Sequence, residues 1–199
     1  MRDEYLDKVI ALLGDSSGGA ADPDSWARLE LDLGFAFPED YKILLDSYAP
    51  VKLNGHLLLQ HPATSRWNLG RYIHETCQAW SEIPWDEEVE GDPRQLLGLD
   101  EFEFGTERGL TPIASADSGQ TVFLARYSGG RPLLIVEDGE GEFFAYNMSF
   151  SEWLYRYLIG EDMSGPNSSY LYPGPVKLES MPMTSDAQVA EWYGPEREM

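Results

Sequence analysis

The spacing of apolar residues predicts two helices that flank a breaker in the first quarter of the chain. Trp26, Leu29 and Leu33 fall at i, i+3 and i+7, which places them on one face of a helix. Gly34 suits the left-handed position that ends such a helix, and Pro38 suits the first turn of the next one. The second helix continues the apolar spacing with Tyr41, Leu44, Leu45 and Tyr48. We therefore expect a pair of short helices joined by a tight turn.

Further helices are predicted on both sides of this pair. An amphipathic pattern covers residues 4–13, and residues 68–81 carry an apolar stripe at helical spacing. Ser149 and Glu152 have the spacing of a capping box at the start of another apolar run. A last helical turn or two is expected over residues 186–193.

Turn signals separate the segments that favour strands. Asn54-Gly55, between two short apolar runs, predicts a two-residue hairpin. Between residues 110 and 147, three Gly-containing turns join four short strands, and such short links favour an antiparallel meander. Helices before and after a run of strands predict an α+β fold. Its sheet is expected to be mostly antiparallel, with the N-terminal hairpin and the C-terminal meander packed against helices.

The order of residues in the helix pair resembles the signature of the SUKH superfamily, the SMI/KNR-type proteins. The likeness is carried by Trp26, Leu29-Glu30, Leu33-Gly34, Phe37-Pro38-Glu39-Asp40-Tyr41, Leu44-Leu45 and Tyr48. A second likeness covers 111–160, where a meander leads into a helix entered by Phe-Ser-Glu-Trp-Leu. The family includes the fungal regulator of cell-wall glucan synthesis and immunity proteins of bacterial polymorphic toxin systems. The resemblance implies a SUKH-like fold and a protein that works by binding another protein.

The resemblance also suggests a domain organisation. Residues 1–162 are expected to form one SUKH-like domain with a matching core over 22–160. Ala49-Pro50 replaces a Gly-rich turn that is common in the family, and the 80–107 region has no counterpart. Within it, we interpret residues 82–107 as an acidic excursion over the surface. Residues 163–199 are rich in Pro, Gly and Ser and are expected to be an extension on the surface.

Charge narrows the possible partners. The chain has 35 acidic and 14 basic residues, which gives a net charge of −21. A general surface of this kind is unsuited to nucleic acid or anionic lipid, but it suits a basic protein. Solubility, or a source whose proteins are generally acidic, is the alternative reading. A single cysteine, no apolar run long enough to span a bilayer and no export signal favour a cytoplasmic protein.

No catalytic or metal-binding pattern stands out. His56, His61, His74 and Cys77 lack the spacing of known zinc sites, and Cys77 falls within an apolar stripe. The chain contains no phosphate-binding glycine loop. The Asp-Gly-Glu-Gly-Glu run at 138–142 lacks the spacing of a calcium loop and favours a turn. We therefore expect a protein that is not an enzyme and that needs no metal or cofactor.

The excursion over 82–107 is the candidate binding surface. It contains ten acids and one base, Arg94. Aromatics among charges are typical of an interface with anchoring rings and a steering rim. The predicted partner-binding residues are Trp85, Asp86, Glu87, Glu88, Glu90, Asp92, Asp100, Glu101, Phe102 and Glu103. In the alternative reading, this is a solvated loop whose aromatics only hold it against the core.

The signature residues Trp26, Glu30, Gly34, Pro38 and Tyr41 are expected to be structural, with Glu30 at a helix end or a neighbouring turn. The resemblance makes an immunity protein the leading hypothesis, one that binds and blocks a toxin that is basic and acts on nucleic acid. A regulatory scaffold of the fungal type is the alternative. A hydrolase that uses an acidic pair is a minor one, since paired carboxylates are abundant in so acidic a chain.

Overall fold

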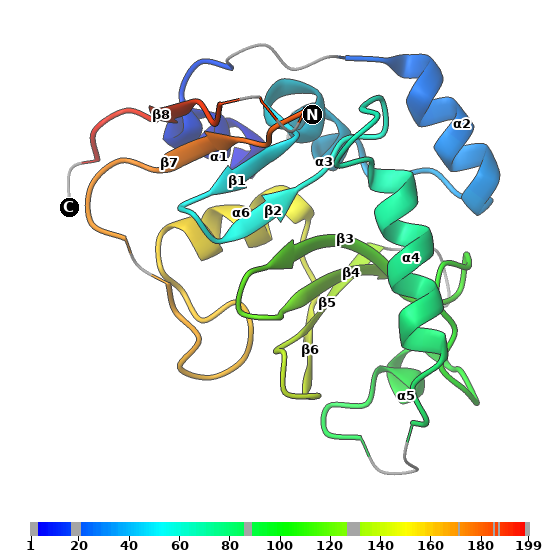
Figure 1. Cartoon of the computed structure of the whole chain (residues 1–199). Coiled ribbons are helices and arrows are strands. Elements are labelled where there is room, and N and C mark those ends of the chain that lie inside the picture. The colour runs from blue at the N-terminus through cyan, green and yellow to red at the C-terminus, as the bar shows by residue number, and fades with distance from the viewer. Residues whose placement is uncertain are drawn as a thin grey trace.

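The computed structural model describes residues 4–16, 21–85, 89–126, 132–170, 172–184, 186 and 188–197. Within these ranges the chain forms six helices and eight strands (Figure 1). The helices are α1 (Glu4–Leu13), α2 (Pro23–Leu33), α3 (Glu39–Tyr48), α4 (Leu69–Ser81), α5 (Pro93–Leu97) and α6 (Phe150–Leu158). The strands are β1 (Val51–Leu53), β2 (Leu57–Leu59), β3 (Thr111–Ala116), β4 (Thr121–Arg126), β5 (Pro132–Glu137), β6 (Phe143–Tyr146), β7 (Lys177–Ser180) and β8 (Glu191–Tyr193).

All eight strands belong to one antiparallel sheet, in the order β6-β5-β4-β3-β2-β1-β7-β8. The predicted hairpin (β1–β2) and the predicted meander (β3–β6) join where Leu57 pairs with Ala116. The α+β class is therefore confirmed, and its two strand groups form a single sheet.

The sheet is buried on both faces in its middle. Along β4, Val122 and Leu124 face the larger core, on which α1, α3 and α6 pack, while Phe123 and Ala125 face a second core. The second core takes Leu97 from the short helix α5 and Trp80 from the end of α4. It is covered by the segment between α4 and β3, which is the excursion that the sequence placed on the surface.

Local sequence explains the helix and turn boundaries. Asp22 caps α2 by accepting from the backbone N–H groups of the first turn, and Gly34 ends that helix with φ 78°. Asn54 and Gly55 both have positive φ in the β1–β2 turn, as the hairpin prediction requires. Pro38 stands immediately before α3 rather than in its first turn, because the helix begins at Glu39.

The C-terminal extension differs from its prediction. The helical turn expected over 186–193 is wrong, because residues 191–193 form strand β8. Lys177–Ser180 form β7, which pairs with β1 and carries β8 on its other side. A helix of one or two turns is hard to nucleate, whereas an open sheet edge offers backbone partners at once. The extension therefore completes the sheet.

The last residues are held against the body of the protein. The guanidinium of Arg197 donates to the backbone carbonyls of Leu158, Tyr172 and Gly174 at 2.9, 2.9 and 2.7 Å. Leu158 is the last residue of α6, so Arg197 supplies a donor to one of the carbonyls that a helix end leaves free. In the described parts of the chain, every helix is too short or too polar to cross a bilayer.

Candidate functional site

The signature residue Trp26 joins Asp46 and His61 in a part-buried polar network, here called the signature network, between α2, α3 and the end of the hairpin. Trp26 Nε1 donates to Asp46 Oδ1 at 2.8 Å, and His61 Nε2 lies 3.0 Å from the same oxygen. The backbone N–H of Ala63 donates to His61 Nδ1 at 3.1 Å. In a neutral ring Nε2 therefore carries the hydrogen that bonds Asp46. His61 is fully buried and both of its nitrogens are occupied, so it positions these elements rather than serving as a base.

Glu30 fixes the turn between the two signature helices. Its Oε1 accepts from the backbone N–H of Phe37 at 2.9 Å and lies 3.2 Å from Lys42 Nζ. This answers the question that the sequence left open, because Glu30 holds the neighbouring turn. Tyr41 is also structural: its hydroxyl donates to the carbonyl of Ile113 at 2.8 Å, and burial raises the pKa of that hydroxyl well above its usual value.

Two grooves run along the sides of α2. One, of about 280 Å³, separates α2 from the start of α4, and the other, of about 230 Å³, separates α2 from α3. The first is lined by Ser25, Arg28, Leu29, Asp32, Pro62, Asn68 and Gly70. The second is lined by Pro23, Trp26, Ala27, Glu30, Glu39, Lys42, Ile43 and Asp46. The signature network thus forms the wall of a groove as well as part of the core.

The aromatics of the excursion pack inward. Trp85 stacks on Trp80 with ring centroids 5.5 Å apart and lies 4.4 Å from the ring of Phe102. Phe104 contacts Trp80 and the β4 residue Phe123. These rings cover the second face of the sheet, as the alternative reading of this segment expected. Trp85 and Phe102 are half-buried, so only part of each ring is left for a partner, and their anchoring role stays a prediction.

Six described acids of the excursion divide into two groups, and a seventh, Glu82, accepts from the Gln78 side chain at 3.1 Å. Asp92 caps α5 and pairs with Arg94 Nη2 at 2.8 Å, and Glu103 accepts from the Thr106 hydroxyl at 3.0 Å, so both serve the fold. The other group is exposed and makes no ion pair among the described residues: Glu90, Asp100, Glu101 and Glu107. Asp86, Glu87 and Glu88 lie outside the described residues. Among the described acids of the excursion, Glu90, Asp100, Glu101 and Glu107 are therefore the ones exposed without an ion pair.

Carboxylates crowd where the excursion meets β6. The backbone N–H of Phe143 donates to the carbonyl of Glu90 at 3.1 Å, which seats residue 90 beside the sheet edge. A hydrogen bond that the protonated Glu142 carboxyl donates to Glu90 raises the pKa of Glu142, and burial and the negative charges of Glu90, Asp138 and Glu140 add to the rise. Carboxylates this close repel one another, and a cation on a partner would relieve that repulsion.

The other histidines show no reactive arrangement. His56 Nε2 lies 2.9 Å from the Ser118 hydroxyl, which also contacts Gln120 Oε1. An amide oxygen only accepts, so the hydroxyl proton goes to Gln120 and is not taken up by His56. His74 pairs with Asp32 at 2.8 Å, and burial raises the pKa of Cys77 to about 11. Within the described residues, no three metal-ligating side chains come together.

Exposed leucine and isoleucine side chains are the feature that sequence reasoning missed. Leu31 on α2 is 84% exposed, Ile83 after α4 is 42% exposed and Leu96 on α5 is 39% exposed. The signal was present for Leu31, because it falls on the opposite face from Trp26, Leu29 and Leu33 in the helical pattern.

Comparisons with protein-family models, with curated proteins and with solved structures returned no match for this chain. The fold and the site therefore define a class by their own geometry: an α+β protein with one eight-stranded antiparallel sheet, a part-buried signature network and an anionic excursion. The SUKH likeness remains a prediction from the sequence.

Proposed function

We propose that this chain is a non-enzymatic, cytoplasmic protein-binding module of SUKH type that acts as an immunity protein. Its partner is a bacterial toxin domain with a basic surface, which it binds and blocks. An enzyme that acts on nucleic acid needs a basic phosphate-binding surface, so a dense carboxylate surface is complementary to that class of toxin.

One observation supports this proposal above the others: the excursion presents carboxylates to solvent that the fold leaves without an ion pair. Asp100, Glu101 and Glu107 are exposed, and no lysine or arginine of the described residues pairs with them. The segment that carries them is fixed from beneath by the rings of the second core. Charges held on a fixed segment accelerate encounter with an oppositely charged partner and disfavour wrong ones.

The test uses the protein encoded directly upstream of this chain's gene as the probe. Asp100, Glu101 and Glu107 are replaced together by their amides, and the association rate is measured over a range of salt concentrations. We expect the rate at low salt to fall about tenfold and its salt dependence to weaken. The matched control replaces three exposed acids elsewhere, Asp15, Glu75 and Glu196, by their amides, and it should change the rate much less. Equal effects of the two variants, or no effect of either, would remove the steering claim.

A further inference from the structure

The outward face of α2 carries an apolar ridge that the fold does not use. Pro23, Ala27 and Leu31 are exposed and recur every four residues, so they lie one above the other along the helix. Leu31 is the most exposed large apolar side chain of the described residues, at 84%. We call these three residues the α2 ridge. The buried face of α2 is complete without them, since Trp26, Leu29 and Leu33 supply its contacts with the core.

The ridge stands between two grooves. The groove of about 280 Å³ lies on the side of α4, and the groove of about 230 Å³ lies on the side of α3. A ridge with a groove on each side is the shape by which helices pack on one another. In Figure 1, α2 lies beside the start of α4, while α5 and the excursion lie at the end of α4. The α2 ridge is therefore a different surface from the excursion.

Negative charge surrounds the ridge. Four carboxylates on α2 and α3 line the two grooves: Glu30, Asp32, Glu39 and Asp46. The cations there are already engaged. Lys42 Nζ is 3.2 Å from Glu30 and 3.5 Å from Glu39, and Arg28 Nη2 donates to the Ser25 hydroxyl at 2.8 Å.

Two carboxylates of the α3-side groove are ordered by the fold through one oxygen each. Glu30 Oε1 is occupied by Phe37 N–H and Lys42, and Asp46 Oδ1 by Trp26 Nε1 and His61. No bond of their second oxygens to the described residues is found. Their side chains are 21% and 27% exposed. Groups that are already ordered lose little entropy when a ligand binds.

We infer that the α2 ridge docks a basic amphipathic helix of a partner protein. The partner's apolar side chains cover Leu31 and Ala27, and its arginine or lysine side chains enter the grooves beside them. A second copy of this chain is the wrong occupant, because it would bring the same carboxylates together and carries the same net charge of −21. The basic character of the partner is taken from the proposed function. The docking surface itself does not include the excursion.

The experiment uses the full chain and a synthetic peptide of about 15 residues, with leucine on one helical face and arginine on the other. Backbone amide shifts are recorded during titration. We expect the changes to centre on α2 and on the first turns of α3 and α4. Leu31→Asp should weaken binding about tenfold, because a leucine side chain is no longer removed from water. The matched control is Leu96→Asp, which makes the same change at an exposed leucine of α5 and should leave the affinity within about twofold.

Three results would overturn the inference: no binding of the peptide, equal weakening by the two substitutions, or shifts centred on the excursion. Sedimentation of the protein alone adds a fourth. A dimer that Leu31→Asp dissociates would assign the ridge to a second copy. Binding of the toxin also distinguishes the role of the excursion from that of the α2 ridge. Loss of binding in the variant at Asp100, Glu101 and Glu107 alone supports the excursion and contradicts the ridge, and loss in Leu31→Asp alone does the reverse.

Discussion

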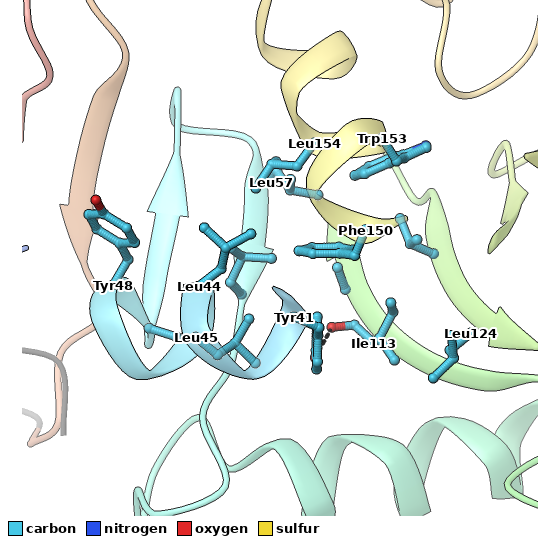
Figure 2. Close-up of a cluster of buried hydrophobic side chains, with 14 of the residues drawn as sticks. Tyr41, Leu44, Leu45, Tyr48, Leu57, Ile113, Leu124, Phe150, Trp153 and Leu154 are labelled. Carbon is cyan, nitrogen blue, oxygen red and sulfur yellow. Dashed lines mark hydrogen bonds between the residues drawn. The ribbon is translucent and has the colours of Figure 1, made fainter. Parts of the chain in front are cut away.

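The hydroxyl of Tyr41, on α3, donates to the backbone carbonyl of Ile113, on β3, at 2.8 Å (Figure 2). The β3–β4 register shifts between Pro112 and Ala114, so Ile113 is the extra residue of a bulge and does not pair with β4 in the ladder. A bulge leaves its extra residue unpaired, and here a side chain from the signature helix supplies a partner. One bond thus ties the helix pair to the meander across 72 residues of sequence.

Replacing Tyr41 by Phe should lower the free energy of unfolding by about 1–2 kcal/mol, because a buried carbonyl loses its donor while the ring stays in place. Urea denaturation measures this change. The control is Tyr155→Phe on α6, since the half-buried Tyr155 hydroxyl makes no hydrogen bond with the described residues. An equal loss in both variants would mean that the Ile113 bond contributes nothing of its own.

Asp46 accepts from both Trp26 and His61, so its removal leaves two donors unpaired. Asp46→Ala should cost about 3 kcal/mol of stability, and Asp46→Asn about 1 kcal/mol, because the amide keeps one acceptor oxygen. Thermal or urea unfolding checks both values. Glu75→Ala, an exposed acid in the middle of α4, is the control and should change stability by less than about 0.5 kcal/mol. If Asp46→Ala were as stable as wild type, the hydrogen bonds of Asp46 to Trp26 and His61 would not contribute to the stability of the fold.

Burial raises the pKa of Glu137 above its ordinary value of 4.5, against hydrogen bonds from the backbone at Gly141 and Gly139 that lower it. The folded state therefore holds this proton more tightly than the unfolded state. As the pH rises from 4.5 through the folded pKa, the contribution of Glu137 to the free energy of unfolding decreases. Glu137→Gln should be more stable than wild type at pH 7 and similar to it below pH 4.5. Unfolding across this pH range checks the sign, and a variant equally stable at every pH would contradict it.

Arg197→Ala should lower stability by about 2–3 kcal/mol, because three backbone carbonyls lose a charged donor. Arg197→Lys should recover only part of that loss, since an ammonium lacks the planar fork that reaches separate carbonyls. Limited proteolysis gives a second measurement, in which cleavage around 188–197 should accelerate in Arg197→Ala. The conclusion fails if the Lys variant is as stable and as resistant as wild type.

The sequence by itself determined the local elements. Asp22, Gly34, Asn54-Gly55 and Ser149 act within a few residues of themselves, through caps and turns. Such signals need no distant partner, so the helix pair, the hairpin, the meander and the α+β class could all be predicted.

Only the tertiary structure decided where these elements meet. It placed Trp85 and Phe102 over the second face of the sheet, and it made residues 191–193 a strand because the free edge of β7 was available to pair with them. It also showed that Asp92 serves α5 while Asp100 and Glu101 point to solvent, and that Leu31 stands uncovered between two grooves. The reason is physical: burial and partnership depend on residues far away in the chain, and composition reports how many charges and rings exist but not which of them the fold has already used.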